Sequence, residues 1–115
     1  MRPLRHKLNI NANNDEATDQ LFDGIFYNQF IHVKKAVDNN KDCVNATNRD
    51  GKTPLMLAVE KEQIEIIKFL IQKGADVNAS FAQEIRPGYR KKTTVFMLAK
   101  NPEIRQILSR AGAVG

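Results

Sequence analysis

Few residues of the kinds that build chemical sites occur in this chain of 115 residues, which has one cysteine, two histidines and no tryptophan. A single thiol, Cys43, cannot form an internal disulfide, so the fold must be held by packing. His6 and His32 lack cysteine or acidic residues at ligand spacing, and we predict no metal site. No Ser/His/Asp or Cys/His set can be assembled, so we predict no catalytic residues and no cofactor.

Long hydrophobic runs are also missing. No apolar segment approaches the roughly 20 residues that a membrane-spanning helix needs. The basic residues Arg2, Arg5 and Lys7 are not followed by an apolar stretch, so the N-terminus does not read as a secretory signal. With one cysteine, these features favour a reducing, cytoplasmic compartment. Delivery into a host cell without a cleaved signal stays open.

Positive charge is in excess, with a formal net charge of +5. One cluster is formed by Arg86, Arg90, Lys91 and Lys92, and another by the N-terminal tail. Such clusters favour acidic partners and speed the encounter with them. They also raise the alternative of nucleic-acid binding.

Residues 53–74 carry the signals of two short helices. Thr53 can cap the first helix by accepting a hydrogen bond from its first turn, and Pro54 suits the first helical position. The apolar positions are Leu55, Leu57, Ala58 and Val59 in the first helix and Ile64, Ile67, Phe69, Leu70 and Ile71 in the second. Gly74 can end the second helix with a positive φ. Helices this short need neighbours to be stable.

The neighbours come from repetition along the chain. Val44-Asn45-Ala46 recurs as Val77-Asn78-Ala79, and Ile10-Asn11-Ala12 is an earlier copy. A period near 33 residues is typical of stacked repeats. We predict repeats at 10–43, 44–76 and 77–113 within one domain at 10–115, after a flexible tail at 1–9. The asparagines are expected to bond local backbone in their turns.

The outer copies depart from the middle one. In the first copy, Asp19 takes the place of Thr53 as a cap, and Phe26, Phe30 and Ile31 add apolar bulk. In the third, Thr94 opens a helix and Asn101 caps the next. The chain stops at a repeat boundary, which suggests a natural C-terminus. Its start near a repeat turn leaves open that earlier repeats were removed.

The run Thr53-Pro54-Leu55-Met56-Leu57-Ala58 resembles the T-P-L-H-x-A signature of ankyrin repeats. The resemblance implies an all-α solenoid of about three helix-turn-helix repeats with short β-turn or hairpin tips. It also implies a non-enzymatic module that binds another protein. Met56 and Met97 replace the usual histidine, and because a methionine can only pack, we expect a somewhat looser stack.

The third copy contains an insertion at 80–92, which we predict to be a basic surface loop. Insertions in a repeat map to one face, often the binding face. The resemblance adds the repeat tip and the end of the first helix. The predicted partner-binding residues are Asn48, Arg49, Asp50, Lys52, Glu60, Lys61, Phe81, Arg86, Tyr89, Arg90, Lys91 and Lys92.

The leading hypothesis is a monomeric scaffold, inhibitor or effector-type adaptor that binds a protein with an acidic surface, and no membrane. One alternative is nucleic-acid binding through the basic loop and the N-terminal tail. The other is a regulatory domain cut from a larger enzyme.

Overall fold

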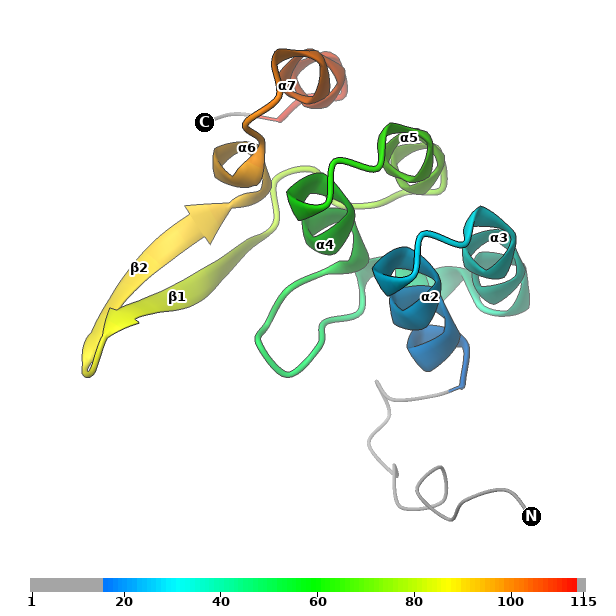
Figure 1. Ribbon diagram of the computed structural model, residues 1–115, viewed down its shortest axis with the longest axis horizontal. Coiled ribbons are helices and arrows are strands. Elements are labelled where there is room, and N and C mark those ends of the chain that lie inside the picture. Colours follow the sequence, from blue (N-terminus) through cyan, green and yellow to red (C-terminus); the bar gives the residue numbers. More distant parts are fainter. Residues whose placement is uncertain (1–15, 114–115) are drawn as a thin grey trace.

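A computed structural model describes residues 16–113. Within this range, three pairs of short helices follow one another, and a β-hairpin lies between the second and third pairs (Figure 1). The elements are α2 (Glu16–Phe26), α3 (Phe30–Asn39), the 3-10 helix η1 (Lys41–Asn45), α4 (Pro54–Glu60), α5 (Ile64–Gln72), β1 (Ser80–Arg86), β2 (Tyr89–Thr94), α6 (Val95–Leu98) and α7 (Pro102–Arg110). The predicted tail at 1–9 lies outside the described residues.

One hydrophobic core runs through the helix pairs, which lie side by side in sequence order (Figure 1). Each pair contributes fully buried side chains, among them Leu21, Ile25, Leu55, Ile67, Leu70, Ile104 and Leu108. The first two helices approach closely at Gly24, where an added Cβ would lie 2.9 Å from Val33 Cγ2. Ile66 is also buried, although it was not among the predicted core positions.

The helix starts follow their predicted caps. Thr53 Oγ1 accepts a hydrogen bond from Met56 N at 3.3 Å, and Pro54 occupies the first turn of α4. Asn101 caps α7 by accepting from Glu103 N at 2.8 Å. These predictions are confirmed.

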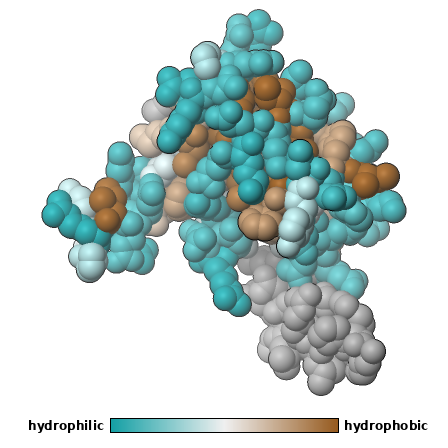
Figure 2. Space-filling model, in the orientation of Figure 1, coloured by the Kyte–Doolittle hydropathy of each residue, from teal (hydrophilic) through white to brown (hydrophobic). Residues whose placement is uncertain are grey.

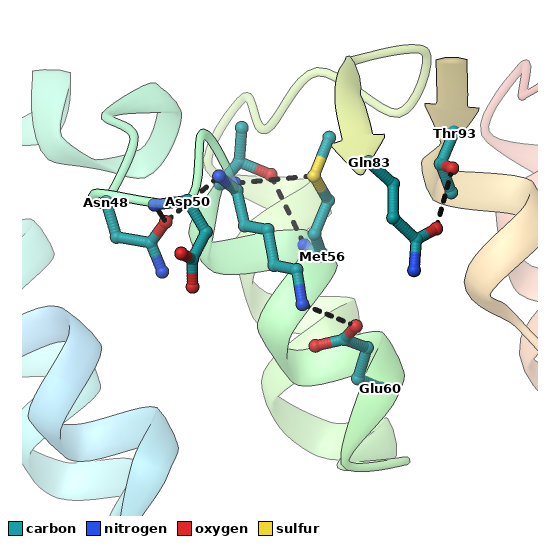
Figure 3. Close-up of polar contacts among 8 residues, drawn as sticks. Asn48, Asp50, Met56, Glu60, Gln83 and Thr93 are labelled. Carbon is teal, nitrogen blue, oxygen red and sulfur yellow. Dashed lines mark hydrogen bonds and ion pairs between the residues drawn. The ribbon is translucent and has the colours of Figure 1, made fainter. Parts of the chain in front are cut away.

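The expectation that Met56 can only pack is wrong. Its Sδ atom accepts a hydrogen bond from Thr53 N at 3.5 Å, which completes a reciprocal capping pair (Figure 3). A thioether is a weak acceptor. The methionine therefore keeps part of the polar role that a capping side chain plays.

Two expectations for the first pair are also wrong. Asp19 lies in the first turn of α2, not at its cap, because the helix already includes Glu16. Phe26, Phe30 and Ile31 do not join the core, and Phe26 and Ile31 are 56% and 61% exposed. The buried residues of α3 are Val33, Ala36 and Val37, which lie on the face toward the stack.

Two asparagines of the repeated turn, Asn45 and Asn78, bond across repeats, not locally as expected, and Asn11 lies outside the described residues. Asn45 Nδ2 donates to Gly74 O at 3.1 Å, and Asn45 Oδ1 accepts from Asp76 N at 2.8 Å. Asn78 Nδ2 donates in the same way to Gly112 O at 3.2 Å. Each contact joins one repeat turn to the next, so these side chains brace the stack along its length.

The segment predicted as a loop is an antiparallel hairpin of β1 and β2. Ser80 lies opposite Thr94, Phe81 opposite Thr93 and Arg86 opposite Tyr89, with an irregularity between Glu84 and Arg86. Pro87 and Gly88 form the turn, and Gly88 has a φ of 78°. Proline followed by a glycine with positive φ fits a type II turn. The fold is therefore mostly helical with one small antiparallel hairpin.

Truncating Leu70 tests the core. We expect Leu70→Ala to lower the free energy of unfolding by about 2–5 kcal/mol, because the fully buried side chain leaves a cavity. Leu57→Ala is the matched control, since Leu57 is only partly buried and packs against the edge of the core. Chemical denaturation measures both. An equal loss for the two leucines contradicts the core described above.

Removing the Asn45 side chain tests the brace. Asn45→Ala loses two hydrogen bonds to the next repeat and should lower the free energy of unfolding by about 1–3 kcal/mol. Asn39→Ala, at an exposed position at the end of α3, is the control. Thermal and urea unfolding measure the free energy of unfolding of both variants. Equal values for the two would show that Asn45 does not brace the stack.

Candidate partner-binding surface

The tip of the second repeat is a tight turn from Asn48 to Lys52. Asn48 Oδ1 accepts hydrogen bonds from Asp50 N at 2.9 Å and from Lys52 N at 3.0 Å (Figure 3). Gly51 has a φ of 84°, a conformation that glycine adopts without strain. Asn48 therefore shapes the tip, whereas Arg49 and Asp50 are exposed.

Lys52 connects this tip to α4 and to the hairpin. Its Nζ atom lies 2.8 Å from Glu60 Oε2 (Figure 3) and 5.4 Å from the centre of the Phe81 ring. The ion pair is partly exposed and by itself adds little stability. Phe81 packs against the core, and a Cβ added at Gly51 would lie 3.6 Å from Phe81 Cβ. The tip and the base of the hairpin are thus in contact.

The hairpin carries the basic cluster away from the helix stack. Thr93 is buried and its Oγ1 donates to Gln83 Oε1 at 3.1 Å, which joins the strands near the base (Figure 3). Beyond this point every side chain is exposed. The space-filling view shows mostly hydrophilic surface on the hairpin, with an apolar residue toward its end (Figure 2). Exposed apolar side chains there are Ile85 and Tyr89.

The end of the hairpin pairs a cation with an aromatic ring. The guanidinium carbon of Arg86 lies 5.2 Å from the centre of the Tyr89 ring. Arg90, Lys91 and Lys92 follow along β2, all exposed. Glu84 Oε2 accepts a hydrogen bond from Gly88 N at 3.2 Å, so the one carboxylate of the hairpin helps to fix the turn.

The predicted binding residues divide into three groups, of which the first is the tip itself with Asn48, Arg49 and Asp50. Lys52, Glu60 and Phe81 come together at the base of the hairpin, beside the tip. Arg86 and Tyr89, with the basic residues of β2, lie along the projecting part. Lys61 belongs with none of these groups, because its Nζ atom lies 4.6 Å from the centre of the Phe26 ring.

Sequence reasoning missed an exposed aromatic surface on the first two helix pairs. Phe26, Tyr27, Phe30 and Ile31 are all exposed, and Phe30 packs edge-on against Phe69 with ring centres 5.3 Å apart. Lysines lie over the rings of this surface, including Lys61 and Lys34. Phe30 and Ile31 precede the buried positions of α3 by one turn or less. Aligning α3 with α5 pairs Ile31 with the exposed Glu65, a signal that could have separated Ile31 from the core, whereas it pairs Phe30 with the apolar Ile64 and gives no such signal.

Metal binding and thiol reactivity depend on how histidine, cysteine and acidic side chains are placed among the described residues. Between residues 16 and 113, no group of three histidine, cysteine or acidic side chains is placed to hold a metal ion. Cys43 is buried, and its Sγ atom lies 3.7 Å from Ala36 O as a weak donor. The tip and the hairpin instead present exposed cations and hydrogen-bond donors. In the same part of the chain, no helix combines the length and apolar character needed to cross a bilayer.

Known proteins have sequences similar to parts of this chain. A family profile of ankyrin repeats in three copies matches residues 6–81. Alpha-latrocrustotoxin-Lt1a of Latrodectus tredecimguttatus is 40% identical over 67 residues, which is 58% of this chain and 5% of the toxin. Palmitoyltransferase akr1 of Schizosaccharomyces pombe is 49% identical over 47 residues, 41% of this chain and 7% of that protein.

Putative ankyrin repeat protein L38 of Acanthamoeba polyphaga mimivirus is 29% identical over 117 residues, covering 90% of this chain and 61% of the viral protein. The chain thus spans less than two thirds of each of these relatives. The profile match covers more than half of the chain and includes the signature at Thr53 and Pro54. With the stacked helix pairs and the braced turns, the chain belongs to the ankyrin-repeat family.

Proposed function

We propose that this chain is a non-enzymatic module that binds a partner protein through the second-repeat tip and the β-hairpin. Ankyrin repeats generally mediate protein–protein interactions, and the roles that fit are a scaffold, an inhibitor or an effector-type adaptor. The helix pairs act as a rigid solenoid. The observation that supports the site is the contact of Lys52 with both Glu60 and Phe81, which fixes the hairpin base against the tip.

The partner surface is acidic in this proposal. Residues 80–94 contain four basic side chains, at positions 86, 90, 91 and 92, and one acidic side chain, Glu84. Exposed charge of one sign steers an oppositely charged partner into encounter. The anchored hairpin base limits the ordering that binding requires, which favours affinity. The protein is a monomer in this proposal, and the compartment is cytoplasmic.

A second candidate is nucleic-acid binding through the same hairpin. A two-stranded antiparallel ribbon fits the major groove of B-DNA, and this ribbon carries Arg86, Arg90, Lys91 and Lys92. Binding of this kind would weaken steeply with salt. The third candidate, a regulatory domain of a larger enzyme, draws on the match to a protein named as a palmitoyltransferase, of which this chain covers 7%.

Replacing the hairpin side chains tests the leading proposal. The variant Arg86→Ala, Tyr89→Ala, Arg90→Ala and Lys91→Ala should lower partner affinity by about 100-fold or more, since Tyr and Arg are frequent hot spots. The partner is first identified by affinity purification from native lysate with mass spectrometry, and its affinity is then measured by calorimetry.

The control variant carries Lys35→Ala, Lys41→Ala and Lys68→Ala, which removes a similar charge from exposed helix positions. Unchanged affinity in the hairpin variant, or an equal loss in the control, would contradict the proposed site. A mobility-shift titration with a DNA duplex at two salt concentrations separates the second candidate.

A further inference from the structure

The hairpin has an open edge on the side of β2. Among the described residues the sheet contains only β1 and β2, so each strand pairs on one side alone. On the β1 side, Phe81 lies beside Gly51 and under Lys52, which places the second-repeat tip next to that strand. Only the base of β1 has this neighbour, and the two edges differ further in charge, because β1 carries Glu84 and Arg86 whereas β2 carries Arg90, Lys91 and Lys92. Figure 1 shows β2 on the side of the hairpin away from the loop that precedes α4.

The register fixes which backbone groups of β2 point outward. Val95 N donates to Ala79 O at 3.2 Å, which places this pair in the hydrogen-bonded position of an antiparallel ladder. Such pairs alternate with pairs that are not hydrogen-bonded. The hydrogen-bonded pairs are then Phe81 with Thr93 and Gln83 with Lys91.

The intervening residues of β2, Arg90 and Lys92, direct their N–H and C=O groups away from β1. An unpaired row of this kind is a template for another strand.

The charge of β2 selects what can pair there. Arg90, Lys91 and Lys92 are consecutive, and successive side chains of a strand point to opposite faces. Both faces of β2 are therefore basic. A strand added beside β2 would place its side chains about 5 Å from these cations, where opposite charges stabilise the pairing and like charges oppose it. A second copy of this hairpin would set like charges side by side.

We propose that the partner adds an extended acidic segment to the outer edge of β2 as a third strand. This inference rests on the function proposed above and specifies how the partner is held. Backbone groups of Arg90 and Lys92 supply hydrogen bonds, and the three cations select glutamate or aspartate in the added strand. An isolated two-stranded hairpin is marginally stable in water, and a third strand adds to its stability.

The first test uses a synthetic peptide in which glutamate alternates with valine, added to the full chain labelled with nitrogen-15. We expect hydrogen exchange at the Arg90 and Lys92 amides to slow by about tenfold or more at saturation. The Lys91 amide, already bonded to β1, serves as the internal reference and should change much less. A peptide with lysine in place of glutamate should not bind.

Two matched changes separate strand addition from side-chain contact. Two peptides are compared, each methylated on every second backbone nitrogen. In one, the methyl groups block the N–H donors that face β2, and in the other they block the N–H donors that face solvent. Only methylation of the donors that face β2 should weaken binding of the peptide to the protein, by about tenfold. In the protein, Lys92→Pro removes an outward N–H at an edge position that tolerates proline, and it should bind about tenfold more weakly than Lys92→Ala.

Several results would overturn the inference. No binding of the glutamate peptide at about 1 mM, or equal effects of the two methylation patterns, excludes strand addition. If Arg90→Ala and Lys92→Ala weaken partner binding measurably while Lys92→Pro binds as tightly as Lys92→Ala, side chains alone bind the partner and only this inference fails. If the four-residue hairpin variant binds the partner normally, the proposed function fails as well. Steep salt dependence with a DNA duplex, without protection of the Arg90 and Lys92 amides, points to a nucleic acid in place of a strand.

Discussion

Burial of short helices against one another is the constraint from which the rest of this structure follows. The longest described helix has 11 residues, and helices of this length are marginal alone in water. Leu21, Leu70 and Leu108, one from each pair, are fully buried in the single core that the pairs share. Asn45 and Asn78 add polar contacts between successive turns. Apolar packing thus supplies the stability, and the asparagines fix the spacing at which the pairs stack.

That stack also determines where the hairpin can project. The hairpin begins directly after the turn that contains Asn78 and ends at Thr94, whose hydroxyl caps α6 by accepting from Met97 N at 3.3 Å. Val95 and Thr93 are buried at its base. Both ends are therefore held by the core, while the side chains of the strands beyond Thr93 are exposed. The base of the hairpin is thus fixed by packing and its charged side chains are exposed, which is the arrangement that a binding element needs.

Local signals predicted much of the fold, and long-range contacts account for what was missed. Thr53, Pro54 and Gly74 start or end a helix through residues within one turn of their own positions, so their roles could be predicted from neighbours in the sequence. Asn45 bonds residues about one repeat away, and nothing in its own turn distinguishes that contact from a local one. Phe26 and Phe30 are apolar enough for a core, yet their exposure depends on the rotation of α2 and α3 within the stack. The hairpin had a usable signal in Pro87-Gly88 between strand-forming residues, but the density of charge favoured a loop interpretation.

The charges that favoured a loop interpretation also explain how the hairpin can expose a strand edge without pairing with its own copies. An exposed strand edge invites pairing with any chain, and natural proteins place lysine there to prevent aggregation. On β2, Arg90, Lys91 and Lys92 repel a second copy of the hairpin on both faces. Repulsion of like charge is also attraction of opposite charge, so protection against self-association and selection of an acidic strand arise from one set of residues. Specificity of this kind requires both the attractive and the repulsive element. A neutral hairpin with the same backbone would offer the same hydrogen bonds to every extended chain and would discriminate against none.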